Sequence, residues 1–161
     1  VASLLPAGPL VVDAKLLRAM QGHPYFALAP PKSSGRDRFN PQWLERALAV
    51  APAREARDVQ ATLAELTARV CATDVLRHAG TAGELLVCGG GAFNDHLIRR
   101  LSALLPGVSV VRTDVRGLPA TQVEAAAFAW LACAHCERRT ANIPAVTGAA
   151  GARVLGALYP A

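Results

Sequence analysis

The amino-acid sequence predicts an α/β fold in which a small sheet containing parallel strands is flanked by helices. Two short apolar runs, residues 84–88 and 108–112, have the length of buried strands, and helical patterns lie before, between and after them. The order strand, glycine turn, helix, strand and helix is that of a βαβα unit with parallel strands. With 161 residues and a hydrophobic fraction of 52%, the chain is long enough to form one buried core.

The first third of the chain is predicted to be helical and rich in proline. Apolar residues recur at helical spacing over 10–20. The connector 23–36 contains several prolines and a glycine, which disfavour a regular element. A second helix is expected from Asn40, a common capping residue, to Pro52, which breaks helices. We therefore treat residues 1–54 as an N-terminal segment of the fold.

The remaining helices are predicted within the core and tail, residues 55–161. The longest covers 55–79, where apolar residues mark one face at steps of three and four, and Arg57, Glu65 and Arg69 supply its polar side. Further helices are expected over 94–105, over 121–136 and, in the tail, near 152–158.

The charge of the chain does not point to a nucleic-acid partner. The net charge is +5 and the sequence pI is near 9.5, but the basic residues are scattered and do not alternate with aromatic residues in a cluster. No stretch of about 18 residues is free of charges and turn formers, so we expect no membrane segment. Residues 1–6 lack a starting methionine and a basic flank, so a cut or processed end is expected there instead of a signal peptide.

The cysteines give no strong signal for a metal site. Cys133 and Cys136 have the spacing of a redox pair, but they fall at the end of an alanine-rich helix, where a thiolate is not stabilised. Cys71 and Cys88 form no second close pair, as a structural zinc site would require. We interpret the four as buried or half-exposed thiols in a reducing cytoplasm, with a redox or metal role as the less favoured alternative.

The most informative local feature is a glycine triplet at the predicted end of the first strand. Gly89, Gly90 and Gly91 follow the strand directly, and Asn94 stands at the start of the next helix. Ligands of α/β folds bind at the carboxyl ends of strands, and glycines let the backbone approach a bound ring or phosphate. The alternative is a tight turn with positive φ, which needs one or two glycines. We predict that Gly89, Gly90 and Gly91 bind nucleotide and that Asn94 either joins them in facing the ligand or caps the helix. The pattern is neither the Rossmann nor the Walker fingerprint.

Other noticeable residues are interpreted as structural. The segment 32–36, Lys-Ser-Ser-Gly-Arg, has the composition of a phosphate clamp, but it follows prolines instead of a strand, so a surface connector or an inter-lobe contact is favoured. The histidines show no metal-ligand spacing. Trp43 and Trp130 lie in predicted helices and are expected to anchor the core, because large aromatic side chains bury the most area.

The glycine turn and its surroundings resemble one enzyme family. Residues 87–94, Val-Cys-Gly-Gly-Gly-Ala-Phe-Asn, resemble the adenosine motif of the sugar kinase, heat-shock chaperone and actin superfamily. The flanking stretches are similar to the C-terminal half of the anhydro-N-acetylmuramic acid kinases and span nearly the whole chain in order. These stretches are 24–26, 31–36, 58–63, 65–67, 101–107, 113–114, 124–125, 127–132, 142–144, 146–149 and 154–157.

The resemblance implies a two-lobed kinase with ribonuclease-H-like lobes around a cleft. Residues 1–161 would be its C-terminal lobe, and 55–161 the nucleotide-binding core and tail. The implied enzyme is cytoplasmic and uses ATP, Mg²⁺ and water to convert 1,6-anhydro-N-acetylmuramic acid to N-acetylmuramic acid 6-phosphate in peptidoglycan recycling. Its implied partners are the amino sugar, ATP and the N-terminal lobe, and a homodimer is left open.

The sequence departs from the family pattern in its catalytic motifs. The phosphate-binding Gly-Thr-Ser-x-Asp-Gly turn, the catalytic aspartate and an Asp-Thr-Gly-Pro-Gly-Asn segment do not occur in this chain. The resemblance places them upstream, so we assign no catalytic residue here and expect the general base in the N-terminal half. The chain alone is therefore expected to be inactive. The rival interpretation is a non-catalytic nucleotide-binding or interaction module of the same superfamily.

Two carboxylates are candidates for the sugar side of the cleft. Glu124 begins an otherwise apolar helix, and the resemblance implies that it helps to hold the sugar; the alternative is a favourable interaction with the helix dipole. Asp114 follows the second strand and either faces the cleft or makes an Asx-turn, of which the turn is favoured. No metal ligand is predicted.

Overall fold

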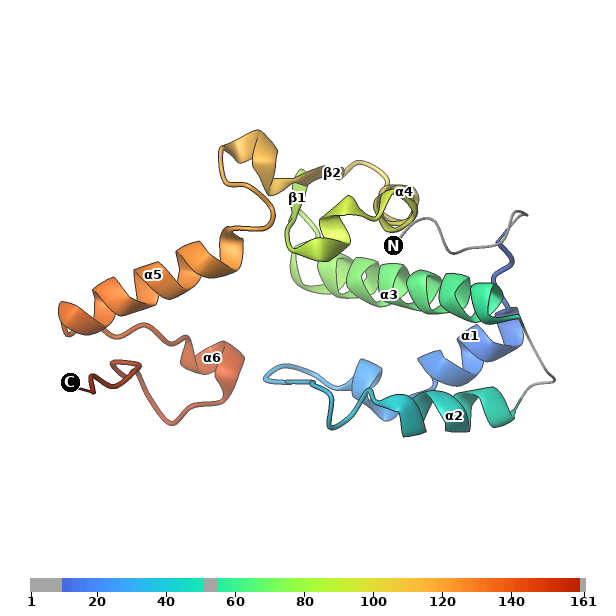
Figure 1. Ribbon diagram of the computed structural model, residues 1–161, viewed down its shortest axis with the longest axis horizontal. Coiled ribbons are helices and arrows are strands. Elements are labelled where there is room, and N and C mark those ends of the chain that lie inside the picture. The colour runs from blue at the N-terminus through green and yellow to red at the C-terminus, as the bar shows by residue number, and fades with distance from the viewer. Residues whose placement is uncertain (1–9, 51–54, 160–161) are drawn as a thin grey trace.

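The computed structural model describes residues 10–50 and 55–159, which form helices around a small sheet (Figure 1). The helices are α1 (Ala14–Gln21), α2 (Pro41–Ala49), α3 (Ala56–His78), α4 (Asp95–Leu104), α5 (Val123–Cys136) and α6 (Pro144–Thr147). The strands are β1 (Glu84–Val87) and β2 (Ser109–Arg112), and the 3₁₀ turns are η2 (Pro24–Ala27), η3 (Gly90–Phe93) and η4 (Thr113–Arg116). The predicted features at 1–6 and at Pro52 lie outside the described residues.

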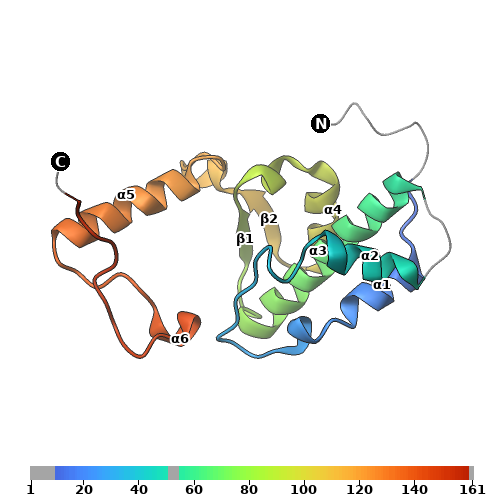
Figure 2. The same cartoon turned by 60° about the horizontal axis from the view of Figure 1, so that its bottom comes forward.

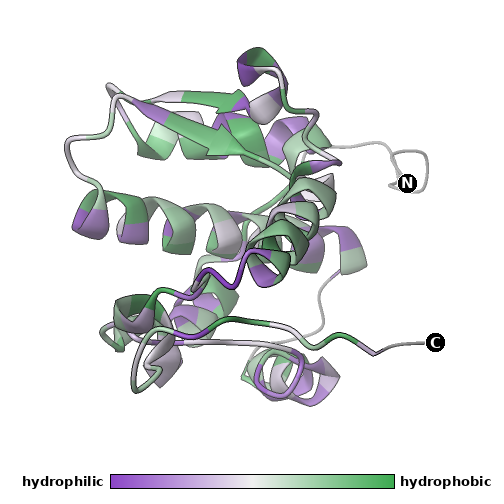
Figure 3. Ribbon diagram, turned by 90° about the vertical axis from the view of Figure 1, so that its left-hand side faces the viewer, coloured by the Kyte–Doolittle hydropathy of each residue, from purple (hydrophilic) through white to green (hydrophobic). Residues whose placement is uncertain are grey.

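The sheet consists of two parallel strands, which confirms the predicted α/β character. Leu85 pairs with Val110 and Leu86 with Val111, and α4 connects the two strands and packs against β2 (Figures 1 and 2). Both strands are mostly hydrophobic (Figure 3). The first strand was expected to be buried, and this is wrong in part: Leu86 is 42% exposed. Alternate side chains of a strand point to opposite faces, and Leu86 lies on a face that the described residues leave open.

Helix α3 is the central support of the fold, and its predicted span is confirmed within a residue at each end. Helix α4 packs against one part of it and α1 against another. The residues that it buries include Ala61, Ala68 and Ala72, whose small side chains let neighbouring helices approach closely. Glu65, predicted to lie on the polar side, is only 2% exposed. That prediction was wrong, because position 65 shares the inward-facing register of these alanines.

A hydrophobic cluster joins the first helices to α3. Leu16, Leu17, Met20 and Leu66 form its buried centre, and Trp43 packs against it, which confirms the predicted anchor. The connector and the residues just after it add aromatic contacts to this cluster, including Phe26 stacked on Phe39 and Phe39 edge-on to Trp43.

The predicted helix over 10–20 begins only at Ala14, because the side chain of Asp13 caps it.

Helix α5 and the tail extend away from this body as an arm (Figures 1 and 2). Phe128 is 64% and Trp130 51% exposed, so the prediction that Trp130 anchors a core is wrong for this chain. The tail helix lies at Pro144–Thr147, and the helix predicted near 152–158 is absent. Instead, the side chain of Asn142 accepts a hydrogen bond from the backbone N–H of Arg153, which holds this stretch in a loop. In the described part of the chain, no helix has the length and hydrophobicity needed to cross a membrane.

Candidate nucleotide site

The site begins at the carboxyl ends of the two parallel strands, where two loops meet. One loop is the glycine turn, residues 89–94, after β1. The other is the loop 113–120 after β2, which includes η4. The backbone N–H of Gly89 donates to the carbonyl oxygen of Ala120 over 2.7 Å, and the guanidinium of Arg112 lies 5.1 Å from the ring centroid of Phe93. These contacts hold the two loops together at the edge where α/β folds bind ligands.

The turn conformation requires glycine at only one of the three positions. Gly89 has a φ of 75°, which disfavours residues with a side chain, while Gly90 and Gly91 have ordinary φ values. A Cβ placed on Gly90 would meet no heavy atom within 4 Å, and one on Gly91 would lie 3.7 Å from Leu97 Cδ2, an ordinary contact. The fold alone therefore accounts for Gly89 but leaves Gly90 and Gly91 unexplained.

The triplet lies open at the surface. Gly89, Gly90 and Gly91 are all exposed, and no side chain covers the position where a Cβ of Gly89 or Gly90 would stand. Bare backbone of this kind offers a flat surface and exposed amide groups to a ring or a phosphate. The arrangement is suited to contact with a ligand, whereas a buried triplet would have removed that interpretation.

Asn94 caps the helix that follows the turn. Its side-chain Oδ1 accepts from the backbone N–H of Leu97 over 3.1 Å, and its own N–H donates to the carbonyl of Gly91. The amide nitrogen Nδ2 takes no part in this capping bond. Asn94 therefore fixes the relation between the turn and α4, and its exposed amide group is available for a ligand as well.

The two candidate carboxylates occupy different environments. Asp114 lies in the loop after β2, where its Oδ2 accepts from the N–H of Ala120 over 3.3 Å, so it helps to shape the loop that contacts Gly89. Glu124 is exposed in the first turn of α5, near the positive end of the helix dipole. The structure brings Asp114 to the glycine turn, but it places Glu124 on the separate arm.

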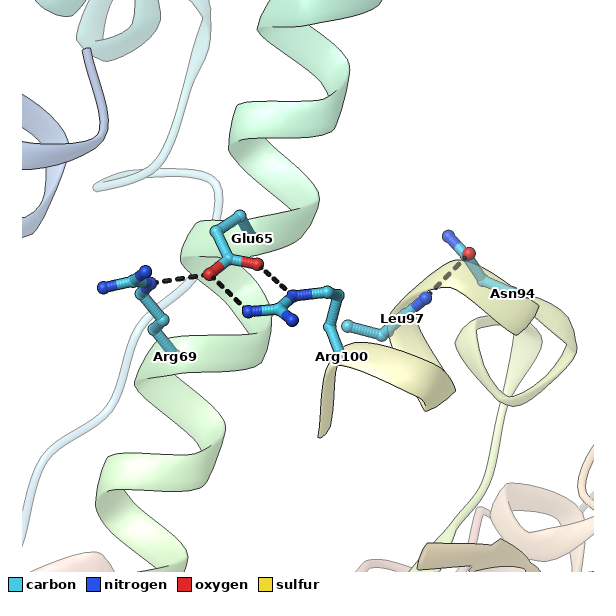
Figure 4. Close-up of polar contacts among 5 residues, drawn as sticks. All are labelled: Glu65, Arg69, Asn94, Leu97 and Arg100. Atoms are coloured by element: carbon cyan, nitrogen blue, oxygen red, sulfur yellow. Dashed lines mark hydrogen bonds and ion pairs between the residues drawn. The ribbon is translucent and has the colours of Figure 1, made fainter. Parts of the chain in front are cut away.

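Sequence reasoning missed an ion-pair cluster behind the turn, in which the carboxylate of Glu65 is buried and the two arginines are partly exposed (Figure 4). Both carboxylate oxygens of Glu65 are bonded to Arg100 of α4, at 2.6 Å from Nε and 3.0 Å from Nη2, and Oε1 also accepts from Arg69 Nε at 2.7 Å. These bonds, chiefly those from Arg100, lower the pKa of Glu65 to about 2. The available signal was the spacing of Glu65 from Ala61, Ala68 and Ala72 on one helical face.

The other noted residues show no second chemical centre. Lys32 bonds to Asp74 of α3 at 3.2 Å, which ties the connector to the body. All four cysteines are free and exposed, whereas buried or half-exposed thiols were expected. A hydrogen bond to Glu137 raises the pKa of Cys133, which opposes a reactive thiolate. Among the residues described, no three metal-binding side chains come together.

Comparison with known proteins gives one consistent family. The sequence profile of anhydro-N-acetylmuramic acid kinases matches residues 7–161. Relatives with that name include proteins from Variovorax paradoxus, 60% identical over 146 residues, and Albidiferax ferrireducens, 56% identical over 154 residues. A third, from Cupriavidus pinatubonensis, is 56% identical over 151 residues. The matches cover 91%, 93% and 92% of this chain but only 39%, 39% and 40% of the relatives, so the chain spans about two fifths of their length.

Proposed function

Because this chain belongs to the anhydro-N-acetylmuramic acid kinase family, we propose that it forms the adenosine-binding, C-terminal part of a two-lobed kinase with ribonuclease-H-like lobes. The observation that carries the proposal is the exposed glycine turn at the carboxyl edge of the parallel strands. Gly90 and Gly91 have no conformational need to be glycine, so contact with a bound adenosine gives a reason for them. Asn94 would complete the site from the start of α4.

The reaction proposed for the whole enzyme uses ATP and water on 1,6-anhydro-N-acetylmuramic acid. Water attacks the anomeric carbon and opens the anhydro bridge, and the oxygen released at position 6 takes the γ-phosphoryl group, giving N-acetylmuramic acid 6-phosphate and ADP. A carboxylate general base accepts the proton of the water. We place that base in the part of the enzyme outside this chain and assign this chain the adenosine side of the cleft, in a cytoplasmic enzyme of peptidoglycan recycling.

Glu124 is the proposed contact to the sugar, and Asp114 is a weaker candidate for the same side of the cleft. Both carboxylates are exposed. An ionised carboxylate readily accepts hydrogen bonds from the hydroxyl groups of a sugar. Magnesium would screen the phosphates of ATP. Because the described residues offer no cluster of three ligands, we assign no magnesium ligand in this chain and derive no step from it.

The partner proposed for the arm is the remainder of the same enzyme. Helix α5 is apolar along most of its length, yet the described residues leave Phe128 and Trp130 largely exposed. A face of this kind is normally covered in the working protein. The relatives are long enough to supply the cover, since this chain spans about two fifths of them. The alternative is that a second copy of the enzyme covers the same face. The molecular mass of the full-length enzyme in solution distinguishes a monomer from such a homodimer.

A non-catalytic nucleotide-binding module is the second candidate function. The exposed glycine turn would serve such a module as well as a kinase, because it contacts only the adenosine. The coding sequence upstream of residue 1 decides between the two: a phosphate-binding Gly-Thr-Ser-x-Asp-Gly turn and a following catalytic aspartate are expected for the kinase.

The glycine turn can be tested with a matched pair of substitutions. Gly90→Val adds a branched side chain where the fold leaves open space, and Gly83→Val does the same at the opposite end of β1. In the full-length enzyme, we expect Gly90→Val to weaken ATP binding about tenfold or more and Gly83→Val to leave it unchanged, measured by titration calorimetry. Equal affinity in the two variants and the wild type would remove the proposed site.

A further inference from the structure

The ion-pair cluster around the buried carboxylate of Glu65, behind the glycine turn, connects two helices that are distant in sequence. Glu65 belongs to α3 and Arg100 to α4, and their side chains meet through two hydrogen bonds. A carboxylate that accepts a paired bond from a guanidinium is fixed in both distance and angle, since both groups are planar. Together with the packing of the two helices, the pair therefore helps to set where α4 lies along α3 and how it is rotated.

The glycine turn is tied in turn to the first residues of α4. Asn94 caps the helix through the N–H of Leu97, and its own backbone N–H donates to the carbonyl oxygen of Gly91. The side chain of Leu97 lies nearby, since a Cβ built on Gly91 would be 3.7 Å from Leu97 Cδ2. Arg100 follows Leu97 by three residues, so the two lie on neighbouring turns of one helix face (Figure 4). A shift of α4 relative to α3 would consequently move the turn, because the contacts between Asn94, Leu97 and Gly91 travel with the helix.

Packing alone does not explain a charge in this position. Leu101 and Leu105 of the same region are 4% and 0% exposed and already bury apolar surface. Removing charges from water costs several kcal/mol per ion, and well-packed apolar side chains of similar volume often stabilise as well or better. A paired guanidinium and carboxylate require a defined distance and angle, whereas apolar contacts tolerate small displacements.

We propose that Glu65 is a positioning residue for the nucleotide, acting through Arg100 and helix α4 on the turn formed by Gly89 to Asn94. The inference rests on the proposed function, because it takes this turn as the adenosine contact. Arg69 has a different role in the cluster. It bonds to Glu65 from within α3, one turn further along, so it neutralises the carboxylate without holding α4.

The difference between the two arginines provides the experiment. Arg100→Met removes the hydrogen bonds to Glu65 that join α4 to α3. Arg69→Met removes one hydrogen bond to the Glu65 carboxylate from within α3. Adenine nucleotide binding to the full-length enzyme is measured by titration with ADP well below the unfolding temperature. We expect Glu65→Gln and Arg100→Met to raise the dissociation constant about tenfold, within the range of coupling through positioning contacts, and Arg69→Met to change it less than about twofold.

Two further variants separate positioning from stability. Leu66→Ala destabilises the other side of α3, where it packs with α1, and is expected to lower the unfolding temperature without changing ADP affinity. Arg100→Lys keeps the charge but loses the paired bond, and is expected to fold and to bind with an intermediate affinity. If Leu66→Ala and Arg69→Met weaken binding as much as Arg100→Met, or if none of the variants does, the positioning role is wrong. If the wild-type enzyme binds ADP and Gly90→Val binds it equally well, the proposed site fails as well, which is a distinct outcome.

Discussion

Two regions of the molecule use apolar residues differently. The body consists of α1, α3, α4 and the sheet, and the arm consists of α5 and the tail. In the body, Leu16 and Leu105 are fully buried, and Glu65, the one buried carboxylate among the described residues, is paired. In the arm, Phe128 and Trp130 face solvent although α5 is the more hydrophobic helix. The body thus has a buried core and a paired carboxylate, although Leu86 remains exposed and the buried atoms His96 Nε2 and Thr113 Oγ1 have no hydrogen-bond partner in the described part of the chain. The arm has the composition of a buried helix but exposes its large aromatic side chains. This contrast suggests where the rest of the enzyme would sit.

The largest effect expected from this contrast is on activity. We expect the chain alone to show no phosphorylation of 1,6-anhydro-N-acetylmuramic acid, and the full-length enzyme to show turnover, because the general base is assigned outside this chain. A coupled assay for ADP release with the anhydro-sugar measures this. Turnover by the chain alone would show that the arm and body need no further lobe.

The next effect concerns stability and compares one residue from each region. Leu16→Ala should destabilise the chain by about 2–5 kcal/mol, because it leaves a cavity in the hydrophobic cluster. Phe128→Ala should change the stability by less than about 0.5 kcal/mol, because a largely exposed side chain loses little on truncation. Chemical denaturation measures both. In the full-length enzyme Phe128→Ala is expected to become clearly destabilising, and a small effect there would contradict a covered arm.

The smallest effect is a pH dependence that belongs to the body. The pKa of Glu65 in the folded chain is lowered from 4.5 to about 2 by Arg100 and Arg69, so its contribution to stability is present above pH 4.5 and is lost as the pH falls towards 2. Glu65→Gln should destabilise the chain by about 1–3 kcal/mol at pH 7. That deficit should shrink below pH 4.5, as measured by denaturation at several pH values. A deficit that is constant down to pH 2 would contradict the paired carboxylate.

Sequence patterns predicted the elements whose signals are local. The periodicity of α3, the apolar runs of the strands and the capping sequence Asn40-Pro41 each depend on neighbouring residues, and each element appears as expected. The position of the glycine turn could be predicted for the same reason. Its role as an adenosine contact stays a prediction.

The features that the sequence did not reveal depend on contacts between distant segments. The burial of Glu65 needs Arg100, 35 residues away, and the loop at 151–153 needs the side chain of Asn142. Trp130 was expected in a core because aromatic residues usually are, but it is 51% exposed, with the guanidinium of Arg139 lying 5.9 Å from its ring centroid. Tertiary partners decided each of these cases, whereas local propensity pointed elsewhere.

The most direct test of the account is a titration of the isotope-labelled chain with ADP, observed by the backbone amide signals of residues 89–94. If this turn contacts the adenosine, the amide signals of Gly89, Gly90 and Gly91 should shift most and saturate together, while those of the arm change little. If the saturable signal shifts occur at other residues and the signals of the three glycines do not move, the turn is not the adenosine contact.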